Sequence, residues 1–390
     1  MKIGIDISQT AFPGSGVARY TQNLALSLLD ESARDSSLPD EYSFFFSSLR
    51  KSPPEEILKA IRSPHSLKRM FIPPTLLAYL WNHLHRVPVE TFMGKLDVFI
   101  SSDWTQPPVR HAKSVTIIHD MIPYLYPETS TTQTHFRASN LTIQPNIVAT
   151  HIDRLAWVAQ ECDCIIADSH STKRDIMSCL DIPSDIIQVV YPAVEVIHAT
   201  PSAQAQVRSS YGLSRPYLLT VGKIEPRKNI PALIQAFAQS GLWKSHDLAL
   251  VGAQGWGDAS QALDVQPEAL SALKWLGFVP DPDLFALYAQ ADQCVMPSLY
   301  EGFGFPIIEA MAMGCPVACS HTSSLGELGN GYAELFDPLN IDDIADTIVR
   351  LQSSLDAKVY DTLSAQTYAQ TFTRKRFADD IHACLTSVVY

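Results

Sequence analysis

The chain has 390 residues, more than the ~250–300 at which a single hydrophobic core stops growing, so two domains are expected. Hydrophobic residues make up 46% and charged residues 18%, which leaves no room for long disordered tails. The 41 acidic and 29 basic residues give a net charge of -12, which argues against a nucleic-acid-binding protein. The seven cysteines are an odd number and several lie in apolar runs, which favours reduced thiols in a cytoplasmic protein.

Short apolar runs rich in β-branched residues alternate with helical patterns along the whole chain. This alternation predicts an α/β protein built from βαβ units with parallel sheets. In doubly wound sheets, ligands bind outside the carboxyl ends of the strands, so the residues that follow each strand are the first candidates for a site. The runs interpreted as strands are residues 2–8, 96–102, 114–120, 163–169 and 186–192, then 216–222, 247–253, 291–297 and 316–320. Residues 192–215, rich in Ala, Ser, Gln and Pro, separate the two series as a linker.

Gly14 and Gly16 lie in a loop after the first predicted strand, just before a helical pattern. The glycines allow close approach of a ligand, and the start of a helix offers N–H groups to an anion. A dinucleotide-binding motif has a third glycine three residues later, where this chain has Arg19. A Rossmann dehydrogenase is therefore disfavoured.

Residues 50–95 form a basic segment in this acidic chain, with eight basic and three acidic residues. The apolar run "MFIPPTLLAYLW" lies inside the segment. This combination suits docking on an anionic membrane. A solvated helical surface with one buried side explains the same composition equally well.

His119 and Asp120 stand at the carboxyl end of the run "SVTII". A histidine at this place can donate a hydrogen bond to a substrate hydroxyl or phosphate, and a purely structural histidine is the alternative. Further along, Lys223 follows the run "YLLTVG" and Lys228 precedes a helix. Two lysines that converge with a helix N-terminus suit a diphosphate, although either lysine alone is equally consistent with a solvated turn.

The stretch "PSLYEGFGFPIIEAMAMGCPV" places Glu301 in the loop after a buried strand and Glu309 in the helix that follows. The backbone of Gly302, Phe303 and Gly304 can approach a ligand between them. Carboxylates accept hydrogen bonds from hydroxyl groups. One carboxylate for a sugar and one for a ribose, with lysines for the phosphates, indicate a nucleotide-sugar site.

These motifs resemble the retaining glycosyltransferases of the GT-B fold, specifically the large family 4. The resemblance runs in order through "GSGVARYTQNL", "IIHDMIP", "ADSHSTKRDI", "VGKIEPRKNI", "LVGAQGW", "LGFVPDPDLFALYAQADQCVMPSLYEGFGFPIIEAMAMGCPV" and "SSLGEL". It implies two Rossmann-like, doubly wound parallel-sheet domains that face each other across a cleft. We expect an acceptor-side domain at residues 1–200, a nucleotide-sugar-binding domain at 201–370, and a C-terminal helix at 371–390 that packs back on the first domain.

The resemblance also implies roles for individual residues. Glu301 lies beside the donor sugar and Glu309 on the nucleotide ribose. Lys223 and Lys228 hold the diphosphate. Three further residues complete the expected site: Gly16 near the diphosphate, His119 near the anomeric carbon, and Val279 in the segment whose backbone meets the base.

The implied activity is a retaining glycosyl transfer in the biosynthesis of bacterial surface polysaccharide, with GDP-mannose favoured as donor and a glycan or lipid-linked saccharide as acceptor. No metal or cofactor is expected, because Asp281-Pro282-Asp283 is interpreted as a helix-capping sequence rather than a metal site. A cytoplasmic enzyme with peripheral membrane contact through residues 50–95 fits this activity. A GT-B nucleotide-sugar epimerase and a non-catalytic nucleotide-sugar sensor are the alternatives.

Overall fold

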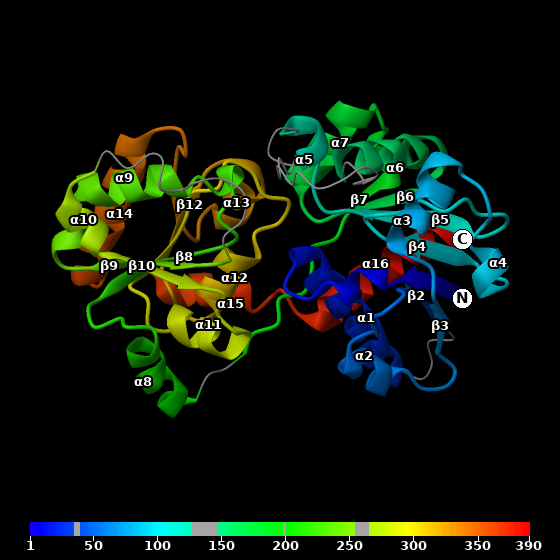
Figure 1. Cartoon of the computed structure of the whole chain (residues 1–390), viewed down its shortest axis with the longest axis horizontal. Helices are drawn as coiled ribbons and strands as arrows, with labels where there is room; N and C mark the ends of the chain where they lie inside the picture. Colours follow the sequence, from blue (N-terminus) through cyan, green and yellow to red (C-terminus); the bar gives the residue numbers. More distant parts are fainter. Residues whose placement is uncertain (35–39, 127–146, 198–199, 254–264) are drawn as a thin grey trace, which may run out of the picture. The chain divides into compact units, whose positions relative to one another are not determined.

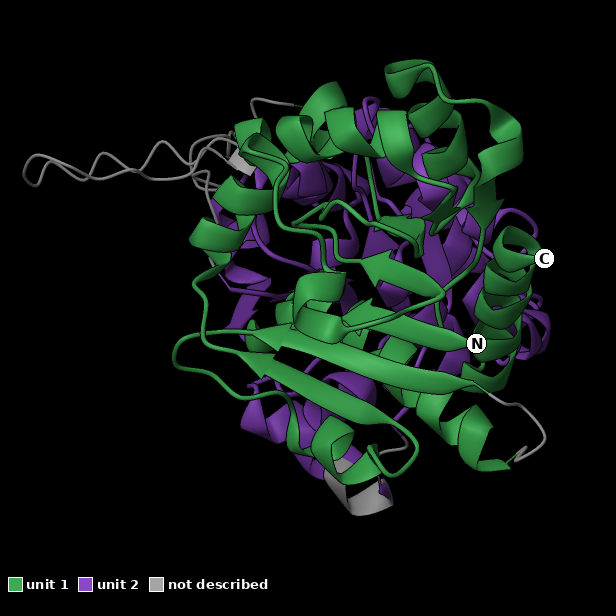
Figure 2. Cartoon of the chain, turned by 90° about the vertical axis from the view of Figure 1, so that its right-hand side faces the viewer, with its two compact units in different colours: residues 1–193, 372–390 green, residues 194–371 purple. Residues whose placement is uncertain are grey.

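The computed structural model describes residues 1–34, 40–126, 147–197, 200–253 and 265–390. The chain divides into two compact units, of which unit 1 comprises Met1–Ala193 and Phe372–Tyr390, and unit 2 comprises Val194–Thr371 (Figure 2). The sequence-based boundaries lie at residues 200/201 and 370/371, close to these limits. Part of the "LVGAQGW" motif and residues 198–199 of the expected linker lie outside the described residues.

Unit 1 is built on a seven-stranded parallel sheet in the order β3-β2-β1-β4-β5-β6-β7 (Figure 1). Because β1 lies inside the sheet and the chain then proceeds in both directions, the sheet is doubly wound with its switch point between β1 and β4. The strands are β1 (Lys2–Asp6), β2 (Glu41–Ser47), β3 (Ser66–Met70), β4 (Val98–Ser101), β5 (Lys113–Ile118), β6 (Cys164–Ala167) and β7 (Ile187–Val189). The sequence analysis missed β2 and β3.

Helices cover both faces of this sheet. Figure 1 shows α1, α2 and α16 on one face and α3, α5 and α6 on the other. The elements are η1 (Ser8–Ala11), α1 (Gly16–Arg34), α2 (Glu55–Ala60), α3 (Pro74–Ala78), η2 (Tyr79–His83), α4 (Glu90–Met93), α5 (Ile122–Leu125), α6 (Ile147–Glu161), α7 (His170–Leu180), η4 (Ser184–Ile186) and α16 (Arg374–Val389). No helix within the described residues is long and apolar enough to cross a membrane.

Both ends of the chain belong to unit 1 and meet at Asp40. The N-terminal ammonium of Met1 lies 2.7 Å from one carboxylate oxygen of Asp40, and Nδ1 of His382 in α16 lies 2.9 Å from the other. Helix α16 also packs along α1. Helix α16 is therefore an integral part of unit 1.

Unit 2 repeats the architecture with a six-stranded parallel sheet in the order β10-β9-β8-β11-β12-β13, so its switch point lies between β8 and β11. The strands are β8 (Tyr217–Val221), β9 (Asp247–Val251), β10 (Leu273–Gly277), β11 (Gln293–Met296), β12 (Val317–Ser320) and β13 (Glu334–Phe336). The expectation of two doubly wound parallel-sheet domains is confirmed, although the sequence analysis missed β10 and β13.

The helical elements of unit 2 include one inside the expected linker. Residues Pro201–Ser210 form α8, which packs against α11, so the linker interpretation of 192–215 was wrong for these residues. The elements are α8, η5 (Pro226–Lys228), α9 (Ile230–Ser240), η6 (Leu242–Lys244), α10 (Pro267–Ser271), α11 (Asp281–Tyr288), α12 (Phe305–Ala312), α13 (Ser323–Gly329), α14 (Ile341–Asp356) and α15 (Thr362–Ala369).

Candidate functional site

Three neighbouring strands of unit 2 end in glycines at the carboxyl edge of the sheet. Gly222 follows β8, Gly252 follows β9 and Gly277 ends β10. A Cβ atom on Gly252 would lie 2.0 Å from the carbonyl oxygen of Gly222, so no other residue fits there. The glycines leave bare backbone at this edge, next to the exposed side chain of Lys223.

Lys228 lies in η5, and its side chain passes over Gly222. A Cβ atom on Gly222 would meet Cε of Lys228 at 3.1 Å. The Nζ atom of Lys228 donates a hydrogen bond of 2.5 Å to Oε1 of Glu301, in the loop after β11. Two residues that the sequence predicts for the site are therefore in direct contact within unit 2.

Arg227 is a site residue that the sequence analysis missed. Its guanidinium donates to Oε2 of Glu301 at 2.7 Å and to the carbonyl oxygen of Tyr300 at 2.6 Å. A second nitrogen donates to Glu225 at 2.6 Å. Arg227 stands directly before Lys228 in "EPRKN", and this adjacency was the available signal. The two cations together hold both oxygens of the Glu301 carboxylate.

Glu301 is charged at every physiological pH. Burial raises the pKa of this carboxyl group, but the charges of Arg227 and Lys228 outweigh burial and lower the pKa to about 2. Its side chain is 13% exposed. A partly accessible carboxylate of fixed charge can accept hydrogen bonds from hydroxyl groups of a ligand.

Two serine side chains of α13 hold the backbone of the Glu301 loop. The amide of Glu301 donates to the hydroxyl of Ser323 at 3.0 Å, and the hydroxyl of Ser324 donates to the carbonyl oxygen of Glu301 at 2.9 Å. Gly304 closes the loop with a φ of +114°, and a Cβ atom there would lie 2.8 Å from Cδ2 of Leu325. Glycine is therefore required where α12 begins.

Three further predicted residues of unit 2, Val279, Phe303 and Glu309, are more buried than Glu301. Glu309 is 2% exposed in α12, and the hydroxyl of Tyr288 donates to its Oε2 at 3.1 Å. Phe303 and Val279 are each 4% exposed, whereas Phe278 is 72% exposed. At Phe303 and Val279 the backbone, rather than the side chain, is therefore the part that can meet a ligand. Gly302 is partly exposed in the same loop as Glu301 and Phe303.

His119 in unit 1 pairs with Asp168, another residue that the sequence analysis missed. Strands β5 and β6 are in register with Ile118 opposite Ala167, so the next residues of both strands are neighbours. Nδ1 of His119 lies 2.8 Å from Oδ2 of Asp168. The aromatic ring of Tyr20 meets the imidazole edge-on, with ring centroids 4.5 Å apart.

The acidic surroundings of His119 favour its protonated form. Burial lowers the pKa of the imidazole, but the carboxylates of Asp168, Asp103 and Asp120 outweigh burial and raise the pKa to about 9. Asp168 engages Nδ1 of the imidazolium. The second donor, Nε2, points away from Asp168. This geometry suits donation to an oxygen of a ligand.

Gly16 is exposed and is the first residue of α1. Tyr20 lies one helical turn later, on the same face, and contacts His119. Within unit 1 the structure thus brings the start of α1 close to His119. Gly16 and His119 belong to unit 1, and the other predicted residues, Lys223, Lys228, Val279, Glu301, Gly302, Phe303, Gly304 and Glu309, belong to unit 2.

The Asp281-Pro282-Asp283 sequence begins α11, but its N-cap is Pro280 and has no side-chain capping hydrogen bond. The capping interpretation was therefore wrong in detail. The carboxylate of Asp283 instead accepts a hydrogen bond of 2.9 Å from the hydroxyl of Tyr211. Across the described residues, no three His, Cys, Asp or Glu side chains gather as they do around a metal ion.

Comparison with known proteins finds similarity to proteins named as glycosyl and mannosyl transferases. Residues 215–354 match the family described as glycosyl transferases group 1. The chain is 35% identical over 212 residues to the O-antigen chain mannosyltransferase B of Escherichia coli, covering 53% of this chain and 55% of that protein. It is 30% identical over 279 residues to the serotype-specific mannosyltransferase WbdA of Escherichia coli, covering 66% of this chain and 31% of that protein. The chain thus spans at most about half the length of these two relatives.

A solved structure shows the same fold over the whole chain. The sucrose-phosphate synthase of Thermosynechococcus elongatus superposes with a TM-score of 0.70 at 18% identity, covering 99% of this chain and 98% of that one. Its likeness shows that the fold is GT-B.

Proposed function

We propose that this chain, which carries a glycosyl transferases group 1 domain at residues 215–354, is a retaining glycosyltransferase that uses a nucleoside-diphosphate sugar. The observation that carries the proposal is the Glu301 carboxylate held by Arg227 and Lys228 beside the glycine row of unit 2. Cations next to bare backbone suit a diphosphate, and the fixed carboxylate suits sugar hydroxyls.

The same cations suit the charge that develops during the reaction. When the bond between the anomeric carbon and the donor phosphate breaks, negative charge accumulates on the departing diphosphate. Lys223, Arg227 and Lys228 supply three positive charges against the two carboxylates of Glu225 and Glu301, which leaves a net charge of +1. This net positive charge can stabilise the departing diphosphate, which supports catalysis without a metal ion or other cofactor.

The proposed reaction retains the configuration at the anomeric carbon. The acceptor hydroxyl attacks the anomeric carbon on the face that the phosphate leaves, its oxygen forms the new glycosidic bond, and its proton passes to the departing phosphate oxygen. No protein nucleophile is required. Glu301 positions the donor sugar through its hydroxyl groups, and Glu309 accepts from the nucleotide ribose. His119 donates from Nε2 to the sugar near the reacting carbon.

Mannose is the sugar that we propose, with GDP-mannose as the donor. Support comes from the two relatives named as mannosyltransferases. The acceptor is a glycan or lipid-linked saccharide of a bacterial surface polysaccharide, because the first relative is named for the O-antigen chain. The chain acts in the cytoplasm. Nucleic acid is not a partner, in keeping with the net charge of -12.

Peripheral membrane contact is part of the proposal and involves only part of residues 50–95. Figure 1 shows α2 and α3 on opposite faces of the unit 1 sheet, so the basic segment does not form one surface. Three apolar side chains from the end of β3 through η2 are strongly exposed: Phe71 at 63%, Leu76 at 52% and Tyr79 at 52%. Lys68 and Arg69 are exposed in β3, and the Arg69 guanidinium lies 5.1 Å from the Phe71 ring centroid. We assign the membrane contact to these five residues.

A nucleotide-sugar epimerase or a non-catalytic sensor is less well supported. Both named relatives are transferases. A sensor needs only the nucleotide-binding unit 2. It has no use for His119, at a strand end of unit 1, with its pKa raised to about 9.

The first test is a thermal-shift screen of the full chain against GDP, UDP, dTDP, ADP and their common sugars, with and without EDTA. We expect GDP and GDP-mannose to raise the melting temperature equally in both conditions. An acceptor-dependent release of GDP from GDP-mannose completes the assignment. No stabilisation by any nucleotide contradicts the proposed function, and stabilisation that disappears with EDTA contradicts its metal-free form.

A further inference from the structure

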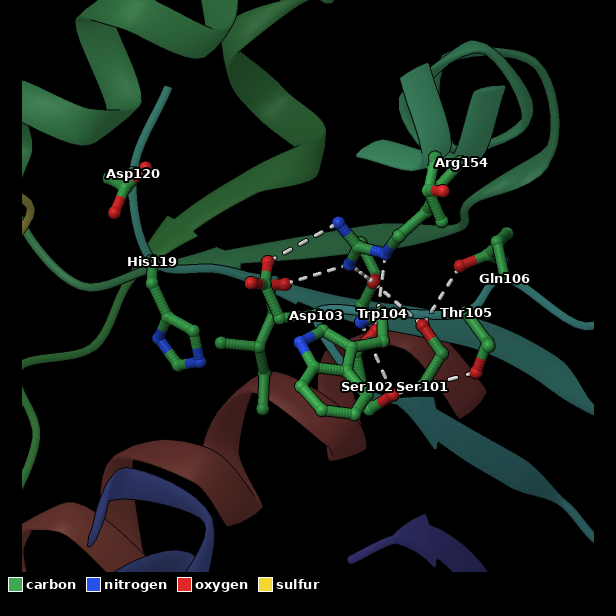
Figure 3. Close-up of polar contacts among 12 residues, drawn as sticks. Ser101, Ser102, Asp103, Trp104, Thr105, Gln106, His119, Asp120 and Arg154 are labelled. Atoms are coloured by element: carbon green, nitrogen blue, oxygen red, sulfur yellow. Dashed lines mark hydrogen bonds and ion pairs between the residues drawn. The ribbon is translucent and has the colours of Figure 1, made fainter. Parts of the chain in front are cut away.

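The loop that follows β4 in unit 1 is held by a buried arginine. Arg154 of α6 is 0% exposed, and its guanidinium donates to the carbonyl oxygens of Ser102 at 3.1 Å and Ile117 at 2.9 Å. It also donates to the hydroxyl of Thr116 at 2.6 Å and lies 3.5 Å from the carboxylate of Asp103 (Figure 3). The guanidinium thereby joins the loop after β4 to the end of β5, directly before His119. A buried charge with this many partners fixes one backbone conformation of the loop.

Two more polar side chains hold the same loop. Asn82 is 3% exposed; its amide donates to the carbonyl oxygen of Trp104 at 2.8 Å and accepts from the amide of Gln106 at 2.9 Å. The hydroxyl of Ser101 donates to the side-chain oxygen of Gln106, which is 0% exposed, at 2.8 Å. These buried hydrogen bonds therefore hold the loop in one conformation without a ligand.

Asp103 and Trp104 are partly exposed, whereas Ser102, Thr105 and Gln106 of the same loop are buried. The Asp103 side chain is 13% exposed, and its charge acts on His119. The ring of Trp104 contacts that of Phe12, with centroids 4.8 Å apart, and Phe12 is 38% exposed. Figure 3 shows the Asp103 and Trp104 side chains between His119 and Arg154.

The aromatic pair of Phe12 and Trp104 lies at the switch point of the unit 1 sheet. Phe12 follows β1 and Trp104 follows β4, which are the strands on either side of the switch point of unit 1. Ligands of doubly wound sheets bind outside the carboxyl ends of the strands at this point. The aromatic pair therefore lies where a ligand of unit 1 is expected, with a carboxylate and an imidazolium beside it.

We propose that Trp104 and Asp103 form the subsite for the acceptor sugar, a pyranose that stacks on the indole ring and donates hydroxyl hydrogen bonds to the carboxylate. An aromatic face packs against the C–H groups of a pyranose, and an ionised carboxylate accepts from its hydroxyls. Arg154 is a positioning residue, because it sets the loop without reaching the ligand. The inference rests on the proposed function, since it names the acceptor side of that reaction.

The test measures binding of methyl α-glycosides of mannose, glucose, galactose and N-acetylglucosamine to the full chain by saturation-transfer NMR. This readout needs neither the donor nor the tryptophan signal. We expect at least one glycoside to bind the wild type, Trp104→Ala to abolish its binding, and Trp104→Phe to retain part of it. Asp103→Asn weakens binding about tenfold, through loss of charged acceptors. Trp275→Ala, a matched change at a tryptophan of unit 2 that is 46% exposed, leaves binding unchanged.

The outcomes separate this inference from the proposed function. Binding of no glycoside, or equal binding by wild type and Trp104→Ala, overturns the acceptor subsite. Nucleotide stabilisation is measured on the same variants, and we expect it to be unchanged in Trp104→Ala, because the proposed nucleotide contacts of unit 2 are intact. A chain that binds glycosides through Trp104 but is stabilised by no nucleotide refutes the transferase and leaves a sugar-binding site.

Discussion

The Nζ atom of Lys228 donates a hydrogen bond of 2.5 Å to the Glu301 carboxylate, so the cation expected on the diphosphate and the acid expected on the sugar form one ion pair. Arg227 completes the pair at 2.7 Å from the other oxygen. The carboxylate reduces the positive charge available to phosphate while it is itself oriented by the cations. In the proposed function, sugar recognition and phosphate recognition by unit 2 are therefore coupled through Glu301.

Replacing Glu301 by glutamine separates the two roles. The variant removes one negative charge beside Arg227 and Lys228, so affinity for GDP alone rises several-fold. Turnover falls by about 10²–10³, because the oriented acceptor for the sugar hydroxyls is lost. Calorimetric titration with GDP and initial rates with GDP-mannose measure the two effects.

Glu225→Gln is the matched control, since it removes the other carboxylate that pairs with Arg227. It raises GDP affinity in the same direction but costs far less turnover. If Glu301→Gln instead weakens GDP binding, the carboxylate does not lower the affinity for the diphosphate. The proposed coupling between sugar and phosphate recognition is then wrong.

Lys228→Ala and Asp283→Ala distinguish cation-held phosphates from a metal site. Lys228 lies against Glu301, whereas Asp283 accepts a hydrogen bond from Tyr211. We expect Lys228→Ala to lower kcat/KM by at least about 10²-fold, a loss of roughly 3 kcal/mol of transition-state stabilisation. Asp283→Ala keeps most activity, and EDTA changes neither enzyme. An inactive Asp283→Ala enzyme that still folds argues for metal catalysis.

The sequence predicted the fold because alternating strands and helices are a local pattern. It singled out Lys228 because this residue precedes a helix, and Glu301 because it follows an apolar strand. It did not predict Asp168, because the contact with His119 depends on the register between β5 and β6. Strand register is a tertiary property that local patterns do not determine. Arg227 was missed for a related reason, since its partners become visible only when the Glu301 loop folds against η5.

The His119–Asp168 pair makes stability depend on pH. The pKa of His119 is raised from 6.5 to about 9 in the folded protein. The pair therefore stabilises fully below pH 6.5, and this contribution is lost as the pH rises through about 9. Asp168→Asn destabilises by about 1–3 kcal/mol near pH 6 and by much less near pH 10. Thermal unfolding of both proteins across this range measures the difference.

The exposed pair of Lys113 and Asp163 provides the comparison for this titration. Their side chains are 46% and 32% exposed and their atoms lie 2.8 Å apart. Asp163→Asn removes an ion pair of similar length that contains no histidine. If the effect of Asp168→Asn is independent of pH, His119 is not protonated in the fold. Activity of the wild type is expected to fall over the same alkaline range, since the imidazolium donates from Nε2.

Gly252 allows the close backbone packing beside the proposed phosphate site. Its φ is +148° and a Cβ atom there would overlap the carbonyl oxygen of Gly222, which directly precedes Lys223. Gly252→Ala is expected to cost about 2–4 kcal/mol of unfolding free energy and to weaken GDP binding by displacing Gly222. Gly241→Ala is the control, because Gly241 has a φ of +74° with no atom within 4 Å of its Cβ position. It costs about 1 kcal/mol and leaves GDP affinity unchanged, as chemical denaturation and titration can show.

The membrane contact proposed for unit 1 is tested by vesicle sedimentation. Arg69 of β3 contacts Phe71, which follows the strand, and Lys68 of β3 is also exposed. Basic side chains near an anionic surface contribute about 1 kcal/mol each, so Lys68→Glu with Arg69→Glu lowers binding to anionic vesicles by at least about tenfold. Phe71→Ser weakens binding by loss of apolar insertion and leaves its salt dependence intact.

Lys59 provides the matched charge reversal for this experiment. It is exposed on α2, on the other face of the sheet from α3, and it pairs with Glu55 at 2.9 Å. Lys59→Glu changes the net charge of the protein in the same direction but removes no residue of the proposed contact. We expect its vesicle binding to equal that of the wild type. Equal losses of binding per reversed charge from Lys59→Glu and the double β3 variant would mean that the vesicles respond to net charge alone. No binding of the wild type at low salt removes the membrane contact altogether.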